Sequence, residues 1–389
     1  MVARRAANEP LPGAPEPWAA SELPAFRGRP PYLMGDMIAA EPALAERLLL
    51  RFSADDAVEQ LVAALREAAA NGHPILTTGC GTSEHAAMGV ATLLNKALNL
   101  PIGRDVRSMP ALEALSRPLA DGLLIAVSHE GGTQITNAAL RAARDAGART
   151  ALITVGGGSP GAEIAELVVQ TEEQDQSWCH TVGYLSPLLA GLSLASRLAA
   201  RKVDALAIRA LLDVTNDPHA AASIASALAG SDRLIIAGSN ADHISARELA
   251  LKVAEGARMP TTALELETVL HGHLAAATRW TGLVLLLTQP EPPNGPIHQR
   301  ALRVLTAAKA LGVPAAAILS AEIASSVPIE NTPAGRIVLP RMGRVGAAAG
   351  SLLGCALALQ ILTERLARAR GINPDTLGRE DPAQAAAHS

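Results

Sequence analysis

Aromatic side chains are scarce in this sequence of 389 residues, of which only 2% are phenylalanine, tryptophan or tyrosine. Because 49% of the residues are hydrophobic, the core has to be built mainly from aliphatic side chains. Proteins that bind nucleic acid commonly place aromatic rings among basic residues, and the sequence has no such cluster. Its formal net charge of −4 provides no basic field either, so we expect no nucleic-acid partner.

Cysteine is also rare. The three cysteines, Cys80, Cys179 and Cys355, are far apart and lack the spacing of a metal site. An odd number of cysteines without pairing logic is typical of a reducing compartment, so we expect a cytoplasmic protein. We expect charges to interrupt every apolar run before it reaches about 18 residues, which predicts no membrane span. No apolar segment follows Arg4 and Arg5, which argues against a signal peptide.

The most informative feature of the sequence is an internal repeat. The segment PILTTGCGTS starts at Pro74 and RLIIAGSNAD starts at Arg233. A second pair, DGLLIAVS from Asp121 and TGLVLLLT from Thr281, is offset by 160 residues. Near-continuous apolar strands that alternate with helices predict parallel sheets covered on both faces. We therefore predict an α/β fold of two tandem doubly wound parallel-sheet subdomains with about five strands each.

The repeat also suggests how the chain is divided. We expect an N-terminal arm and entry helix over residues 1–44, and a first subdomain over residues 45–210. The second subdomain is expected over residues 211–370 and a C-terminal tail over residues 371–389. Residues 1 to about 30 are rich in proline, alanine and glutamate, which predicts a mobile arm or an extended segment lying on a partner.

Two polar loops follow predicted strands of the first subdomain. Their residues are Gly81, Thr82 and Ser83 in the first loop, and Ser128, His129, Glu130, Gly131, Gly132 and Thr133 in the second. Backbone N–H groups, hydroxyls and the positive end of a helix dipole can together hold an anion. The loops therefore predict a sugar-phosphate site. Pro290, Pro292 and Pro293 in the second half cannot donate N–H, so the ligand is expected in the first half.

A helix-like run in the second half, ELALKVAE, places Glu248, Lys252 and Glu255 on one face. Such a stripe suits a solvated helix surface held by glutamate–lysine pairs, or an acid/base site. His271 follows sixteen residues after Glu255. The pair His271-x-His273 has no third ligand spaced nearby, so we expect no metal or other cofactor.

The loops, the duplication and this helix together resemble the SIS (sugar isomerase) superfamily. Within it, the similarity is to the isomerase half of glucosamine-6-phosphate synthase, to aminosugar-phosphate deaminases and to fructosyl-amine-phosphate deglycases. The resemblance covers residues 33 to about 380 and implies SIS-type, flavodoxin-like subdomains. The family's first loop, CGTS, is matched in full. In its second loop, SxSGxT, Ser128, Gly131 and Thr133 match, whereas Glu130 replaces a serine.

The resemblance also implies roles for the residues of the second half. Glu255 matches the family's base, which moves a proton between C1 and C2 of the sugar, and His271 matches its ring-opening histidine. In the family that histidine enters the site from the neighbouring subunit, which implies a homodimer. Glu248 and Lys252 complete the family's E…K..E pattern, and we include them among the catalytic candidates.

The amine of the substrate is a further expectation. The synthase carries a tail lysine that forms a Schiff base, but no lysine follows Lys309 here. The resemblance therefore favours a substrate that brings its own amine, and a deaminase, deglycase or isomerase that acts on an aminosugar or sugar–amine adduct. We find no glutamine-hydrolysing domain or N-terminal catalytic cysteine in the sequence, so glutamine is not expected to be the nitrogen source.

Two alternatives stay open. The chain could be a non-catalytic sugar-phosphate-binding regulatory protein, as some family members only bind ligand. It could also be an enzyme repurposed for an unphosphorylated substrate, because the Glu130 carboxylate repels a phosphate dianion at about 4 Å by roughly 1 to 4 kcal/mol. No arginine or lysine lies within the two loops to neutralise this carboxylate, although Arg104 and Arg107 could approach it.

Overall fold

The structure is a computed structural model that describes residues 27–289, 292 and 295–387. The N-terminal arm expected over residues 1 to about 30 therefore lies almost entirely outside the described residues. The chain forms two compact units. The first contains residues 40–176 and 182–209, and the second contains residues 27–39, 177–181 and the described part of 210–387.

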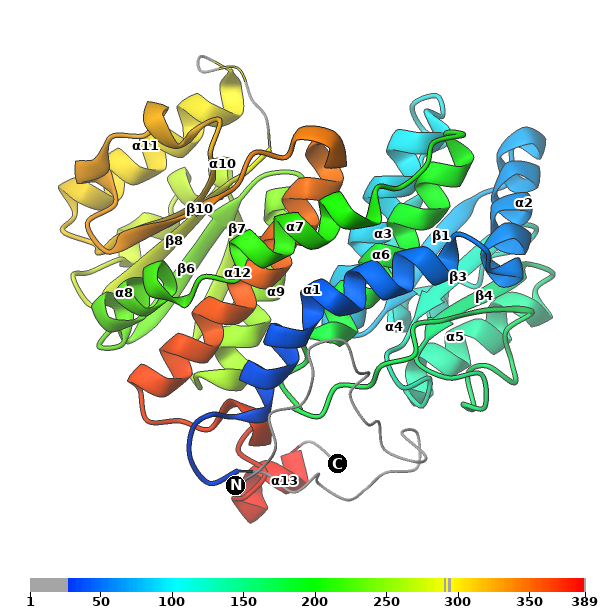
Figure 1. The fold of residues 1–389 in the computed structure, drawn as a ribbon, viewed down its shortest axis with the longest axis horizontal. Helices are drawn as coiled ribbons and strands as arrows, with labels where there is room; N and C mark the ends of the chain where they lie inside the picture. Colours follow the sequence, from blue (N-terminus) through cyan, green and yellow to red (C-terminus); the bar gives the residue numbers. More distant parts are fainter. Residues whose placement is uncertain (1–26, 290–291, 293–294, 388–389) are drawn as a thin grey trace. The chain divides into compact units, whose positions relative to one another are not determined.

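The first unit is built around a five-stranded parallel sheet (Figure 1). Its strands are β1 (Ile75–Gly79), β2 (Arg107–Pro110), β3 (Leu123–Val127), β4 (Arg149–Thr154) and β5 (Leu167–Gln170). Their order, β2-β1-β3-β4-β5, is that of a flavodoxin-like doubly wound sheet. Every residue of β1 and β3 is buried, because helices cover both faces of the sheet.

The helices of the first unit divide between the two faces of its sheet. Helices α3 and α2 both pack against α6, whereas α4 and α5 pack against each other. An aliphatic cluster that includes Leu124, Leu140 and Leu152 joins α5 to one face of the sheet. The helix bounds are α1 (Leu33–Phe52), α2 (Asp56–Asn71), α3 (Thr82–Leu98), α4 (Ala111–Ser116), α5 (Gln134–Asp145), α6 (Val182–Leu198) and α7 (Ala205–Thr215). Helices α1 and α7 contain residues of both units.

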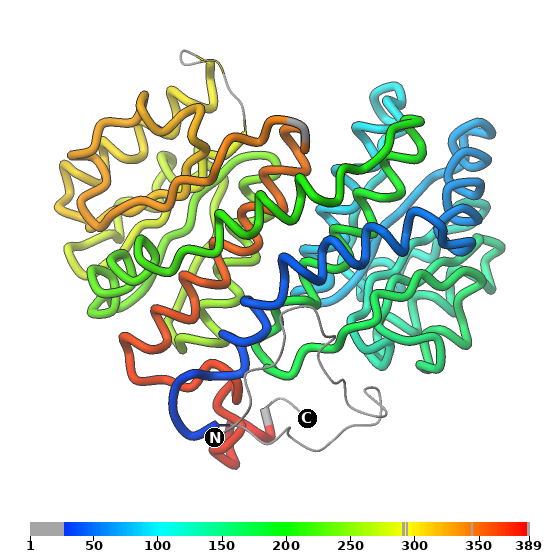
Figure 2. Tube along the Cα trace, in the orientation of Figure 1, coloured from blue at the N-terminus to red at the C-terminus, as the bar shows by residue number. Residues whose placement is uncertain are grey.

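The second unit repeats this design. Its five strands are β6 (Arg233–Gly238), β7 (Thr261–Glu265), β8 (Thr281–Leu287), β9 (Ala315–Ser320) and β10 (Gly335–Leu339). The order β10-β9-β8-β6-β7 is that of the first sheet read from the other edge. The alternation of strands and helices along each unit can be followed in the tube trace (Figure 2).

Two groups of helices cover the second sheet. Helices α8 and α9 pack against α12, whereas α10 and α11 pack on the opposite face over a cluster that includes Leu283, Leu285 and Leu305. The helix bounds are α8 (Pro218–Leu228), α9 (Ala241–Gly256), α10 (Leu266–Leu270), α11 (Pro296–Ala310), α12 (Ala347–Ala369) and α13 (Pro382–Ala387). Short 3-10 turns are η1 (His273–Ala276), η2 (Ala324–Ser326), η3 (Ile329–Asn331), η4 (Gly343–Val345) and η5 (Pro374–Thr376).

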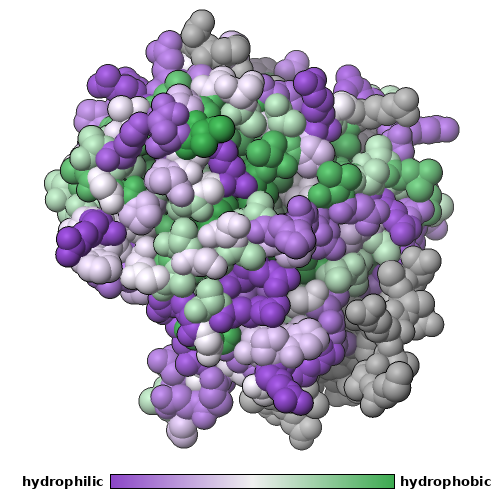
Figure 3. Space-filling view, turned by 60° about the vertical axis from the view of Figure 1, so that its left-hand side comes forward, coloured by the Kyte–Doolittle hydropathy of each residue, from purple (hydrophilic) through white to green (hydrophobic). Residues whose placement is uncertain are grey.

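These sheets confirm the prediction of an α/β fold with two tandem doubly wound subdomains. The predicted apolar strands coincide with β1, β3, β6 and β8, the four strands on which the repeat was recognised. In the view of Figure 3, hydrophilic residues cover much of the surface, with hydrophobic residues interspersed among them.

Helix α12 corrects one expectation. It is the one described helix that is long and apolar enough to cross a membrane by length and composition, although we expected charge to interrupt every such run. Its most apolar 18-residue window is 94% buried inside the protein. Packing against α8 and α9 gives this helix the burial of a core element, so its composition by itself is weak evidence for a membrane span.

Candidate functional site

The two polar loops of the first unit follow neighbouring strands. Strand β1 lies between β2 and β3, so the direction of the strand order reverses between β1 and β3. Ligands of open α/β sheets bind at such a switch point, outside the carboxyl ends of the strands. The Cys80 thiol lies 3.5 Å from the Thr136 hydroxyl of α5, which ties the first loop to the helix that follows the second. The structure thus brings the two predicted loops together.

The first loop makes a sharp entry into α3. Gly81 precedes the helix with φ 57° and ψ −126°, a conformation that side chains with a Cβ atom rarely adopt. Thr82 and Ser83 are the first residues of α3, and both are buried. Their position at the helix N-terminus places them where the helix dipole favours a negative charge.

The second loop closes on itself before α5 begins. The Ser128 hydroxyl donates a hydrogen bond to the Thr133 hydroxyl at 3.4 Å, and the Gly131 N–H donates to the Ser128 carbonyl at 3.2 Å. Gly131 has φ +71°, and a Cβ atom there would collide with the Ser159 side chain, so the position requires glycine. Gly132 and Thr133 complete the loop and are more exposed than Ser128.

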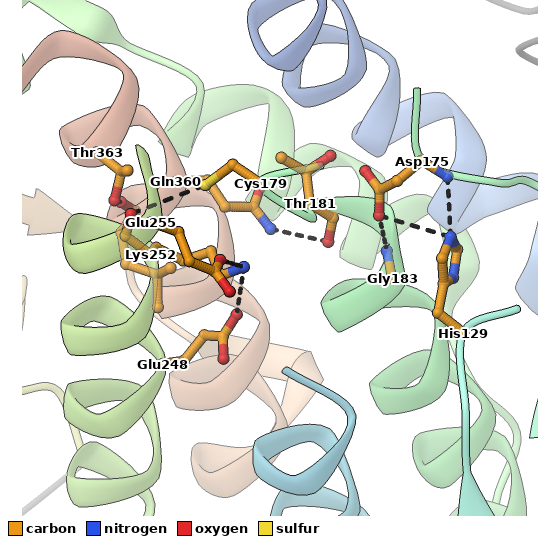
Figure 4. A network of polar contacts seen from close by, with 11 residues as sticks. His129, Asp175, Cys179, Thr181, Gly183, Glu248, Lys252, Glu255, Gln360 and Thr363 are labelled. Atoms are coloured by element: carbon orange, nitrogen blue, oxygen red, sulfur yellow. Dashed lines mark hydrogen bonds and ion pairs between the residues drawn. The ribbon is translucent and has the colours of Figure 1, made fainter. Parts of the chain in front are cut away.

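His129 and Glu130 contact the segment that follows β5. The buried His129 accepts a hydrogen bond at Nε2 from the Asp175 N–H at 2.9 Å, and the Asp175 carboxylate accepts one from the Gly183 N–H at 2.6 Å (Figure 4). Burial lowers the pKa of His129, with partial compensation by Asp175, which favours a neutral imidazole. The Gln174 amide donates to the Glu130 carboxylate at 3.1 Å.

Gln174 and Asp175 were not predicted from the sequence as partners of the second loop. The topology contains the signal, because β3, β4 and β5 run parallel, so β3 and β5 have their carboxyl ends on the same side of the sheet. Arg104, in contrast, donates to the Ala69 carbonyl at 2.7 Å, beyond the amino end of β1. Arg107 starts β2 opposite Leu76, also toward that end. The possible approach of Arg104 to Glu130 is therefore not seen in the structure.

Helix α9 of the second unit holds the candidate acid/base residues. The side chains of Glu248 and Lys252 are 0% and 1% exposed, whereas that of Glu255 is 24% exposed. Lys252 Nζ lies 3.9 Å from Glu248 Oε1 and also donates to Glu255 Oε2 (Figure 4). A solvated stripe is therefore the wrong interpretation of this face, because two of its three charged side chains are buried.

Lys252 keeps its proton in this environment. Burial on its own lowers the pKa of the ammonium, but the neighbouring acids Glu255, Cys179 and Glu248 outweigh it and raise the pKa above the usual value for lysine. The Cys179 thiol also contacts the Lys252 carbonyl at 3.8 Å. A fixed positive charge therefore stands beside the Glu255 carboxylate.

His271 lies at the end of α10, and its side chain is 74% exposed. Its Nε2 atom is 2.8 Å from Glu267 Oε1, and Glu267 Oε2 is 2.7 Å from the Arg300 Nε atom of α11. Glu267 and Arg300 were not among the site residues predicted from the sequence. The four-residue spacing between Glu267 and His271 was an available signal, because residues at that spacing share a helix face.

At the switch point of the second unit, an internal carboxylate is bound by backbone amides. Asp242, near the start of α9, accepts hydrogen bonds from the Thr288 and Gln289 N–H groups at 2.8 and 3.4 Å, and from the Ser351 hydroxyl at 3.1 Å. Burial raises the pKa of Asp242, although the bonds from Thr288 oppose this shift. The backbone N–H groups at the end of β8 thus find their hydrogen-bond acceptor within the chain. Of the prolines on which our expectation rested, Pro290 and Pro293 lie outside the described residues.

Residues 69–201 match the family model of the SIS domain. A glutamine–fructose-6-phosphate aminotransferase (isomerizing) of Symbiobacterium thermophilum is 30% identical over 233 residues, or 56% of this chain and 38% of that protein. The match thus spans well under half the length of this curated relative.

Two solved structures share the fold. The C-terminal domain of glucosamine-fructose-6-phosphate aminotransferase from Francisella tularensis has a TM-score of 0.75 at 19% identity, over 88% of this chain and 97% of that one. The glucosamine-6-phosphate deaminase of Thermotoga maritima has a TM-score of 0.66 at 19% identity, over 88% and 97%. Residues 69–201 of the chain therefore match an SIS domain, and the chain shares its fold with these two structures.

Proposed function

We propose that the chain is an SIS-family enzyme that acts on an aminosugar or a sugar–amine adduct, with Glu255 as the base that moves a proton between C1 and C2. The observation that carries this proposal is the buried row on α9. Glu248 and Lys252 are out of contact with solvent, whereas Glu255, next to the ammonium, is partly exposed. Burying charged groups costs free energy, so a buried row of charged side chains indicates a functional role rather than a contribution to solubility.

The proposed chemistry assigns a separate role to each group. The Glu255 carboxylate takes the proton from one of the two carbons, an enediol or enolamine forms, and the same carboxyl group returns the proton to the other carbon. The Lys252 ammonium holds that carboxylate in place, and Glu248 lies on the other side of Lys252. His271 opens the sugar ring, by analogy with the family that the sequence resembles. Its side chain is exposed, as is expected of a residue that reaches the site of a neighbouring subunit in a homodimer.

The loops of the first unit supply the proposed phosphate site. Ser83 lies at the N-terminus of α3, while Ser128 and Thr133 place hydroxyls just before α5. These are hydrogen-bond donors at two helix N-termini, where an anion is stabilised.

A thermal-shift panel followed by a turnover assay tests this function. We expect glucosamine 6-phosphate or a fructosyl-amine phosphate to raise the melting temperature more than the same sugar without phosphate. Glu255→Gln should then leave that shift nearly intact while turnover falls by about 10²- to 10⁴-fold. Full turnover in Glu255→Gln contradicts the proposed mechanism. A melting shift without turnover by the wild-type protein on any ligand of the panel favours the regulatory alternative.

A further inference from the structure

We infer that Glu267 and Arg300 are positioning residues for His271, which fix its tautomer and leave Nδ1 as the nitrogen that exchanges a proton with the sugar. The inference rests on the proposed function, because it assumes that His271 takes part in ring opening. It adds which nitrogen reacts and which two side chains determine that choice.

Both oxygens of the Glu267 carboxylate are engaged. Oε1 lies 2.8 Å from His271 Nε2, and Oε2 lies 2.7 Å from Arg300 Nε. Glu267 and His271 belong to one short helical segment, whereas Arg300 comes from α11, which packs against α10. Two attachment points on different helices restrict the carboxylate more than a single surface ion pair does, since isolated exposed pairs contribute little.

The geometry selects one tautomer of the imidazole. An ionised carboxylate can only accept hydrogen bonds, so the hydrogen between Glu267 and His271 belongs to Nε2. In the neutral ring the other nitrogen, Nδ1, then carries the lone pair. A carboxylate that holds a histidine in one tautomer and orientation is a recurrent arrangement in acid/base catalysis.

The backbone that carries His271 is itself anchored. The Glu265 carboxylate accepts hydrogen bonds from the Glu267 N–H at 2.7 Å and from the Ser239 hydroxyl. Burial favours a higher pKa for Glu265, but these hydrogen bonds together lower it below its usual value, so the cap stays ionised. The His271 N–H donates to the Glu267 carbonyl at 3.2 Å. A fixed backbone and an oriented ring together define where Nδ1 points.

The step assigned to Nδ1 conserves atoms and charge. The anomeric hydroxyl gives its proton to Nδ1, the anomeric carbon forms a carbonyl, and its bond to the ring oxygen breaks. The ring oxygen takes a proton from water, and the resulting hydroxide recovers the proton from Nδ1. The sugar is converted from the cyclic to the open-chain form without any oxidant or co-reactant.

Nitrogen-15 NMR of the histidine side chains tests the tautomer without any substrate. The spectrum is recorded at a pH of about 8, where histidine is mostly neutral, and the His271 signals are assigned by their loss in His271→Asn. We expect the wild-type protein to show a protonated Nε2 and an unprotonated Nδ1. Glu267→Ala should shift the ring toward a mixture of tautomers, and Arg300→Met should shift it in the same direction by less. Glu330→Ala, an exposed carboxylate of the same unit, is the matched control.

Kinetics supply the second measurement, with glucosamine 6-phosphate as the probe. Glu267→Ala should lower kcat by at least about tenfold with little change in KM, and Glu267→Asp should restore part of the loss. A wild-type ring protonated at Nδ1, or a Glu267→Ala variant that keeps both tautomer and kcat, overturns the inference. Full activity in His271→Ala would contradict the ring-opening role in the proposed function. The NMR result would still decide whether Glu267 and Arg300 fix the tautomer of His271.

Discussion

The carboxylate of Glu130 stands where the family pattern has a serine, and it accepts a hydrogen bond from the Gln174 amide at 3.1 Å. The bond from Gln174 occupies one acceptor position of the Glu130 carboxylate and holds this carboxylate toward the segment after β5. Arg104, engaged elsewhere, does not offset its charge. The sequence could identify Glu130 as a departure, but not its partner, because Gln174 lies 44 residues further along the chain.

Replacement of Glu130 by serine tests what this carboxylate does. If phosphate is the native ligand group, the affinity of Glu130→Ser for glucosamine 6-phosphate, measured by calorimetry, should change by less than about tenfold, or 1.4 kcal/mol. Glu163→Ser, an exposed glutamate of the same unit, controls for general charge effects. A variant that gains phosphate binding and loses its native substrate would instead favour an unphosphorylated ligand.

Helix α9 shows what periodicity can and cannot predict about an element. The spacing of Glu248, Lys252 and Glu255 placed them on one face, and the structure keeps them together. Periodicity could not distinguish a wet face from a buried one, because that depends on what packs against the helix. Here α12 and the segment that contains Cys179 pack against α9, and both are far from α9 in the sequence.

Removal of the buried ammonium should destabilise the second unit. Lys252→Met leaves the Glu248 carboxylate buried beside an apolar side chain, and the loss of one partner of a buried ion pair costs about 3–5 kcal/mol. Urea unfolding should therefore show a lower midpoint, and the double variant Lys252→Met/Glu248→Leu should recover part of the loss. Lys309→Met, at an exposed position, is the control. An unchanged midpoint in Lys252→Met would mean that the row is not an electrostatic unit.

At the scale of the whole molecule, the repeat was sufficient to predict two sheets of the same topology. Strand and helix patterns are local, so they can be recognised from short stretches of sequence. Contacts between distant stretches could not be predicted. Residues 177–181 belong to the second unit although both flanking segments belong to the first, and Asp375 caps α1 by accepting from the Leu33 N–H at 2.8 Å. The amides satisfied by Asp242 are a further long-range feature without a local signal.

Complementation between inactive variants tests the proposed composite site. Glu255→Gln and His271→Ala should each be inactive alone. If His271 acts in the neighbouring subunit, a refolded 1:1 mixture should regain about a quarter of wild-type activity, because half the dimers are mixed and each has one intact site. A mixture of each variant with itself is the control. No recovery, with mixed dimers confirmed by native mass spectrometry, would place Glu255 and His271 of one chain in the same site.

Solvent deuterium exchange tests the C1/C2 proton shuttle most directly. The wild-type protein is incubated in D₂O with glucosamine 6-phosphate or the ligand that the thermal-shift panel selects, and the sugar is followed by proton NMR. We predict that deuterium enters at the shuttled carbon with the wild-type protein, and that Glu255→Gln slows this exchange by about 10²- to 10⁴-fold. Product formation by the wild-type protein without deuterium at that carbon would contradict the account.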